Sequence, residues 1–174
     1  MNVNPEAEIP ESPVVAAVAP NAFAARDVEE ILKERGWLVP GADGVSGEGA
    51  ARLDAWFAQA ALLLGSHSAD RAAFAELLSL IFQFGAAEIL TTHDAQAVMI
   101  RTGSRDVIRE LAKLVLDGAA IDSERFKEII ETLKTKVRLR SRELFHPIRL
   151  ALAGRAGEGE LDRVILLLDS AAAL

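Results

Sequence analysis

The residues best suited to bind another molecule lie in one short basic stretch. Residues 134–155 contain seven Lys or Arg and one acidic residue, whereas residues 1–133 contain 11 Lys or Arg and 21 Asp or Glu. The whole chain has a formal net charge of −7. An acidic protein with one dense basic segment is typical of proteins that contact a polyanion at one place and repel it elsewhere. The alternative is a solvated basic turn without a ligand.

The order of residues in the first part of this stretch indicates a surface with two faces. Val137, Leu139 and Ser141 alternate there with charged residues. In an extended chain, successive side chains point to opposite sides, so the charges would all face one way. We therefore expect residues 136–142 to be extended and to present their cations to phosphate groups, with salt-sensitive binding.

The sequence lacks the usual motifs of catalytic sites. The three histidines, His67, His93 and His146, do not form a His-Glu-x-x-His pair, and the chain has no Cys. There is no Gly-x-x-x-x-Gly-Lys loop, no Gly-x-Gly-x-x-Gly and no Gly-x-Ser-x-Gly. These absences predict a protein that is not an enzyme by itself and needs no metal and no cofactor. An enzyme with an unorthodox site is the remaining alternative.

Hydrophobic periodicity predicts an all-α fold, a helical bundle of about seven to eight helices. Hydrophobic residues make up 51% of the chain, and apolar residues recur at helical spacing along most of it. Residues 1–20 contain four of the six prolines and are expected to form a disordered Pro/Ala/Glu tail. The remaining residues, 21–174, are predicted to form one helical domain, divided into possible lobes at 21–101 and 102–174.

Capping residues predict where these helices begin and end. Ser46 and Ser68 are candidate N-caps, and Asp122 or Ser123 opens a later helix. Pro147 fits only a first helical turn, because proline has no amide donor, so its helix is expected to begin near residue 145. The expected helices cover residues 26–35, 46–64, 68–84, 94–100, 104–116, 123–134, 145–153 and 161–168.

No apolar run approaches the roughly 20 residues that cross a bilayer. The first residues carry Glu6, Glu8 and Glu11 without an early Lys or Arg, unlike a secretory signal. With no cysteine for disulfides, a cytoplasmic protein with no membrane contact is expected.

One segment resembles a known family. Its sequence is Arg142-Glu143-Leu144-Phe145-His146-Pro147-Ile148-Arg149-Leu150-Ala151-Leu152-Ala153-Gly154-Arg155. It is similar to a pattern of bacterial glutamyl-tRNA synthetases near their C-termini, Leu-Phe-x-Pro-hydrophobic-Arg-x-Ala-Leu-Thr-Gly-Arg, which continues with a turn and an apolar helix. The specific resemblance covers residues 142–168, and a looser similarity in helix order extends upstream to about Val28.

The resemblance implies the helical anticodon-binding region of such a synthetase without its catalytic domain. Neither a His-Ile-Gly-His-like nor a Lys-Met-Ser-Lys-Ser-like signature is present. Two positions depart from the family pattern: Ala153 replaces the usual Thr, and the turn at residues 157–159 carries Glu158 close to Arg155 in sequence. The implied partner is tRNA, with tRNA-Glu as the specific expectation, and the module is expected to act either alone or with a separate synthetase chain that carries the catalytic half. The alternative is a protein-interaction or regulatory helical domain that has lost RNA binding.

Charge and resemblance together define the candidate RNA-binding residues. Arg149 has two interpretations, since it can pair with an interior carboxylate or face a phosphate. The apolar residues of the motif, such as Leu144 and Ile148, are expected in the core. The candidate RNA-binding residues are Lys134, Lys136, Arg138, Arg140, Arg142, Arg149 and Arg155.

Overall fold

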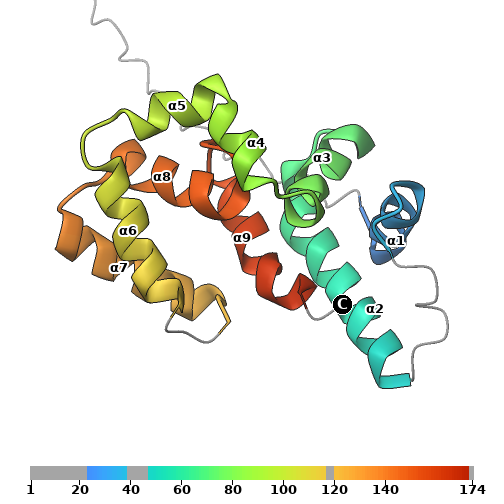
Figure 1. Cartoon of the computed structure of the whole chain (residues 1–174). Helices are drawn as coiled ribbons and strands as arrows, with labels where there is room; N and C mark the ends of the chain where they lie inside the picture. The colour runs from blue at the N-terminus through green and yellow to red at the C-terminus, as the bar shows by residue number, and fades with distance from the viewer. Residues whose placement is uncertain (1–22, 39–46, 117–119, 173–174) are drawn as a thin grey trace, which may run out of the picture.

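The protein is a bundle of α-helices (Figure 1). The computed structural model describes residues 23–38, 47–116 and 120–172, which contain no strand. The helices are α1 (Ala25–Glu34), α2 (Gly47–Leu64), α3 (Arg71–Phe82), α4 (Ala86–Thr91), α5 (His93–Met99), α6 (Ser104–Leu116), α7 (Ser123–Val137), α8 (Ser141–Ala153) and α9 (Glu160–Ala171), with a 3₁₀ turn at Gly65–His67. The predicted all-α class is confirmed. These residues hold nine α-helices, one more than the boundaries read from sequence, because α4 forms an additional short helix.

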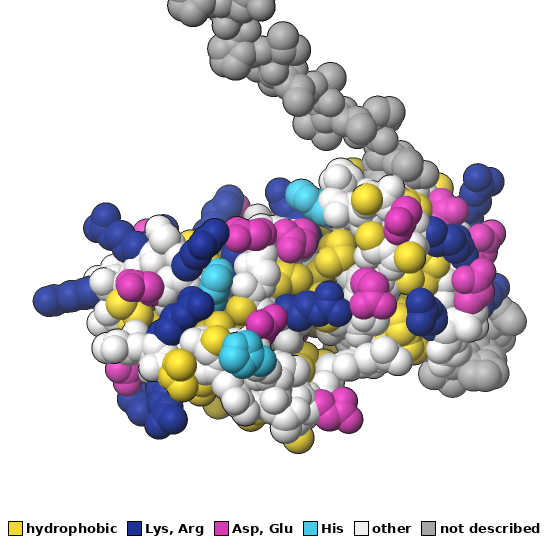
Figure 2. Space-filling model, turned by 90° about the horizontal axis from the view of Figure 1, so that it is seen from above, with side chains coloured by type: hydrophobic (Ala, Val, Ile, Leu, Met, Phe, Trp, Pro, Cys, Tyr) yellow, Lys and Arg dark blue, Asp and Glu magenta, His cyan; other side chains and the backbone are white. Residues whose placement is uncertain are grey.

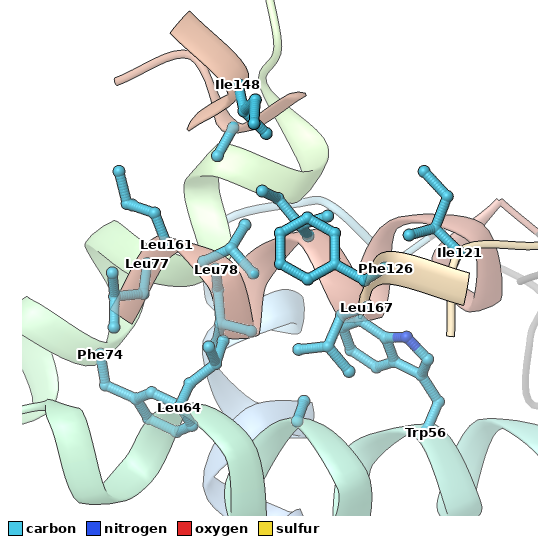
Figure 3. Packing of buried hydrophobic residues seen from close by; sticks show 14 of the residues in the cluster. Trp56, Leu64, Phe74, Leu77, Leu78, Ile121, Phe126, Ile148, Leu161 and Leu167 are labelled. Carbon is cyan, nitrogen blue, oxygen red and sulfur yellow. The ribbon is translucent and has the colours of Figure 1, made fainter. Parts of the chain in front are cut away.

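The main hydrophobic core is built around α9, which lies between the α2–α3 side and the α8 side of the molecule (Figure 1). In Figure 3, Trp56 and Leu64 of α2, Phe74 and Leu78 of α3 and Leu167 of α9 converge on this core. Each such side chain contributes about 1.5–3 kcal/mol when it is removed from water. The packing of α9 therefore holds the two halves of the chain together. The predicted division into lobes at residues 21–101 and 102–174 stays a prediction.

A smaller apolar cluster joins α5 to α8. It consists of Ala95, Val98 and Leu150, with Ile89 of α4 packed against it. This contact fixes the short helices α4 and α5 above α8, next to the segment that resembles the synthetase motif.

Two predicted helix boundaries are wrong. Asp70, and not Ser68, caps α3: its backbone is extended and its side chain accepts a hydrogen bond from the Ala73 amide at 2.8 Å. The Ser68 hydroxyl instead donates to the Leu64 carbonyl behind it, at 3.0 Å. Helix α3 also ends at Phe82, before residue 84. The predicted cap at Asp122 is confirmed, whereas Ser46 and the predicted tail at residues 1–20 lie outside the described residues.

The predicted start of α8 is also wrong. This helix begins at Ser141, so Pro147 lies in its interior. An interior proline costs about 3 kcal/mol because it removes one helical hydrogen bond and crowds the preceding turn. Leu144 and Ile148, on either side of it, are completely buried, and their burial offsets this cost. Tertiary packing thus extends the helix through a residue that usually limits it.

The early start of α8 leaves no room for the predicted extended strand at residues 136–142. Helix α7 continues to Val137 and α8 begins at Ser141, so only three residues connect them. Lys136 and Arg142 are helical, and Arg138 and Arg140 lie in the turn. None of the described helices combines the length and hydropathy needed to cross a membrane.

Candidate nucleic-acid interface

The basic stretch forms a tight turn between α7 and α8. Arg138 ends α7 in a left-handed conformation with φ 56°, and its amide donates to the Lys134 carbonyl at 3.1 Å. Arg140 is extended, and Ser141 again has a positive φ of 49°. Arg138 and Ser141 are the two non-glycine residues with positive φ among the described residues. This conformation costs about 1–2 kcal/mol for a residue with a Cβ atom, so the turn keeps these side chains at some expense in stability.

The turn and the end of α7 surround an open hollow of about 820 Å³, which we call the basic hollow. Lys134 contacts Glu131 here, with Nζ 2.6 Å from Oε1. Arg138 and Arg140 are exposed and make no ion pair with any described residue. The residues lining the hollow are Glu131, Lys134, Thr135, Arg138, Arg140 and Ser141. It therefore holds three cationic side chains and one carboxylate.

Two further predicted cations flank the basic hollow and are paired with acids. The Lys136 ammonium lies 3.2 Å from Glu110 of α6, and hydrogen bonds from Lys113 and Lys136 lower the pKa of Glu110. Arg142 lies 3.6 Å from Glu158, with both side chains largely exposed. The Arg142–Glu158 pair is weak because water and salt screen it. In the Lys136 pair the Glu110 side chain is only 21% exposed.

Arg149 occupies an interior position. Its side chain is 8% exposed. Nε and Nη2 donate to the two carboxylate oxygens of Asp162 at 2.7 and 2.9 Å, and Nη1 donates to the Gly157 carbonyl at 2.9 Å. The hydrogen bonds that Arg149 donates to the Asp162 carboxylate raise the pKa of Arg149. Of the two interpretations of Arg149, the geometry supports the interior ion pair, which joins α8 to α9, and a phosphate contact would have to break it.

Arg155 lies at a different hollow, between α4, α5 and α8. This α4–α8 hollow has a volume of about 650 Å³ and is lined by apolar residues such as Phe84, Ile89 and Leu150. Arg155 is exposed at its rim and pairs with Glu76 at 3.1 Å. Figure 2 views the molecule from this side and shows hydrophobic side chains in the middle of the face, with Lys and Arg side chains projecting at the end where α6, α7 and the start of α8 lie.

The structure thus divides the predicted residues among three places. Lys134, Arg138 and Arg140 line the basic hollow, and Lys136 and Arg142, which are close to them in sequence, pair with acids. Arg149 is buried in an ion pair, and Arg155 lines the α4–α8 hollow.

His146 is a residue of the α4–α8 hollow that sequence reasoning did not single out. Its Nδ1 accepts a hydrogen bond from an Arg101 nitrogen at 3.2 Å, and its Nε2 is buried without a hydrogen-bond partner among the described residues. Burial, followed by the charges of Arg101, Arg142 and Arg149, lowers the pKa of His146. Arg101 and His146 are 45 positions apart, so no local sequence signal connects them. Elsewhere among the described residues, no three His, Cys, Asp or Glu side chains are grouped to hold a metal ion.

Fold and surface together define a helical protein with a cationic turn on an acidic body. The chain is 32% identical over 75 residues to Glutamate--tRNA ligase 2 of Syntrophus aciditrophicus (strain SB). The match spans 43% of this chain and 15% of that protein, so the similarity is distant and partial. No protein-family model and no solved structure matches the chain. The predicted relation to glutamyl-tRNA synthetases is confirmed at this coarser level.

Proposed function

We propose that this chain is a tRNA-binding, anticodon-binding-like module related to glutamyl-tRNA synthetases and non-catalytic by itself. The observation that carries the proposal is the basic hollow, where Arg138 and Arg140 are exposed and pair with no acid in the described part of an otherwise acidic chain. The partial similarity to a glutamate–tRNA ligase supports tRNA as the polyanion.

Electrostatics explains why this surface suits RNA. Each cation that neutralises a phosphate releases condensed counterions, which makes binding favourable at low salt. Arg138 and Arg140 have no ion pair with a described residue that binding would have to break, whereas Lys136 and Arg142 must first leave Glu110 and Glu158. The acidic remainder of the chain repels RNA and so directs it to this end of the molecule.

The basic hollow is suited to the RNA backbone and not to its bases. Reading of single-stranded RNA bases usually needs an aromatic or guanidinium plane on which a base stacks. None of the described residues that line the basic hollow is aromatic, and its two guanidinium groups are taken to contact phosphate and so to be unavailable for stacking. Trp56 is buried, and Trp37 is stacked on Phe82 with ring centroids 5.7 Å apart. Binding through this surface is therefore expected to depend weakly on sequence.

A titration of labelled tRNA-Glu, followed by fluorescence anisotropy at several salt concentrations, tests the proposal. The wild type should bind saturably, and affinity should fall steeply between about 50 and about 200 mM salt. The double variant Arg138→Gln/Arg140→Gln should reduce the salt slope by about 1.4–1.8 units, because two phosphate contacts are lost.

The matched control is Arg26→Gln/Arg52→Gln, which removes the same charge from exposed positions on α1 and α2, away from the basic hollow. It should bind like the wild type at every salt concentration. Equal losses of tRNA affinity in the two double variants would show that only the net charge of the protein matters. Absence of saturable binding at low salt would reject tRNA binding altogether.

We also propose that the module acts either alone or with a separate catalytic chain. Glutamate charging of tRNA by a synthetase lacking its own anticodon-binding region distinguishes these versions. If the module acts with a catalytic chain, adding the wild type should lower the KM of that synthetase for tRNA, and adding the Arg138→Gln/Arg140→Gln variant should not. A stand-alone module should compete for tRNA and slow charging.

The alternative function is a protein-interaction or regulatory domain without RNA binding. Exposed apolar side chains on α4 and just after α5, Leu90 and Ile100, favour it, because exposed apolar groups often mark protein contacts. Sedimentation of the purified protein over a wide concentration range tests self-association. A monomer at all concentrations, together with saturable tRNA binding, would count against this function.

A further inference from the structure

We propose that the basic hollow is a binding site for a single phosphate group, held by Lys134, Arg138 and Arg140 with the Ser141 hydroxyl. This inference rests on the proposed function, since the phosphate is taken to belong to the RNA, but it makes a narrower claim. It predicts one defined anion site where general attraction alone would give a diffuse positive surface.

The first argument is that the backbone between the two arginines is anchored to the rest of the protein. Leu139, between them, is half-buried against the main core and lies against Gly103 at the start of α6. The approach is so close that a Cβ atom on Gly103 would lie 2.7 Å from Leu139 Cδ1. Leu139 therefore anchors the middle of the turn, and its neighbours Arg138 and Arg140 are both among the residues that line the hollow. An anchored turn loses less conformational entropy when it binds a ligand.

The second argument is the balance of charge. The lining residues include three cations, and Glu131 is the carboxylate among them. The Glu131 carboxylate pairs with Lys134 at 2.6 Å and makes no other ion pair with a described residue. A phosphate that replaces Glu131 at Lys134 gains two guanidinium groups that no described acid neutralises. Guanidinium groups donate two parallel hydrogen bonds to phosphate oxygens and are well suited to this contact.

The third argument is the arrangement of hydroxyl groups. Thr135 already donates to the Glu131 carbonyl at 3.0 Å. Ser141 makes no side-chain hydrogen bond to a described residue, and it lines the hollow in a strained conformation with positive φ. Its hydroxyl can donate to an anion. Three cations and one hydroxyl around one hollow match the several oxygens of a phosphate better than the two oxygens of a carboxylate.

Inorganic phosphate is the direct probe of this site. The ¹⁵N-labelled protein is titrated with phosphate at constant ionic strength, with chloride as the balancing salt, while amide and arginine Nε resonances are recorded. Saturable shifts are expected at residues 134–141, and Arg26→Gln/Arg52→Gln should retain them. Arg138→Gln/Arg140→Gln should weaken the affinity roughly tenfold or more, because it loses two charge-assisted contacts. Glu131→Gln should tighten binding several-fold, because it removes the competing carboxylate.

Thermal denaturation of each variant separates loss of binding from loss of folding. Shifts that do not saturate, or that chloride alone reproduces, would overturn the phosphate site. If tRNA still binds in that case, the proposed function stands and only the defined site is rejected. If phosphate saturates the hollow but tRNA does not bind, the RNA function fails and the anion site stands as a site for another phosphate.

The source of the phosphate is separated by two forms of the RNA. Transcripts with and without a 5′-phosphate should bind equally if the hollow holds an internal phosphodiester. A transcript that loses most of its affinity on dephosphorylation would identify the terminal monoester as the ligand. Both results require that Arg138→Gln/Arg140→Gln reduce the affinity, and an unchanged affinity in that variant would reject the site for either source.

Discussion

Replacement of Arg149 by Gln should destabilise the protein strongly, because this side chain holds α8, α9 and the turn between them. The change removes two hydrogen bonds to Asp162 and one to the Gly157 carbonyl. It leaves Asp162, which is 27% exposed, without its cation. Loss of one partner of a buried pair costs about 3–5 kcal/mol, and partial access of water to Asp162 reduces this to about 2–4 kcal/mol.

Chemical and thermal unfolding, followed by circular dichroism, measure this loss. For a chain of this size, about 2–4 kcal/mol corresponds to a lower melting temperature by about 5–15 °C. A double-mutant cycle with Asp162→Asn isolates the pair: the double variant should lose about 1–3 kcal/mol less than the sum of the single variants. Arg155→Gln, which breaks only an exposed pair with Glu76, is the control and should change stability by about 0.5 kcal/mol or less.

The opposite result is equally informative. If Arg149→Gln melted at the wild-type temperature but lost affinity for tRNA, the interior role of Arg149 would be wrong and its side chain would have to turn toward the ligand. Additive losses in the cycle would show that Arg149 and Asp162 stabilise the protein independently, against the geometry of the pair.

Three further predictions concern the turn, a glycine and a histidine. Arg138→Gly should stabilise the protein by about 1 kcal/mol, because glycine tolerates φ 56° without strain, and should weaken tRNA binding. The free energy of unfolding should therefore rise while the affinity measured by anisotropy falls, and a loss of stability would contradict the left-handed conformation of Arg138. Gly103→Ala should lower the free energy of unfolding in urea more than Gly36→Ala does. Both glycines have positive φ, but at Gly103 the new Cβ would also lie 2.7 Å from Leu139 Cδ1, whereas at Gly36 it meets nothing within 4 Å. Equal losses would show that Leu139 does not anchor the turn. His146 should make the protein less stable in mild acid, because folding lowers its pKa and the unfolded chain therefore binds the proton first. The free energy of unfolding should fall as the pH drops below the ordinary pKa of 6.5 and should level off below the pKa of the folded state. The variant His146→Gln should lose this part of the pH dependence.

Helix content was predictable from sequence because it depends on local spacing. The apolar positions of α3 and α9, such as Phe74, Leu78 and Leu161, recur at helical intervals, and each is buried as expected. Periodicity gives the buried face only approximately. In α6, Ala112 lies four positions after the half-buried Ile108 but is exposed, whereas Val107 is buried. The rotation of a helix depends on the elements it packs against, which its own sequence does not specify.

The candidate interface was predictable as a charge pattern but not as a geometry. Seven basic residues between positions 134 and 155 are visible without any structure. Which of them are free depends on acids that are distant in the sequence: Glu110 for Lys136 and Glu76 for Arg155. The pairing of Arg101 with His146 depends in the same way on the contact between the α5–α6 turn and α8.

The sequence alone determined that this protein is helical and acidic with one basic segment, because these properties follow from composition, spacing and local order. Only the tertiary structure decided how the basic segment is used. Burial of Leu144 and Ile148 extends α8 through Pro147 and compresses the expected strand into a turn, and the approach of α9 draws Arg149 into an interior ion pair. Arg138 and Arg140 are exposed at the basic hollow and pair with no acid among the residues that the structure describes.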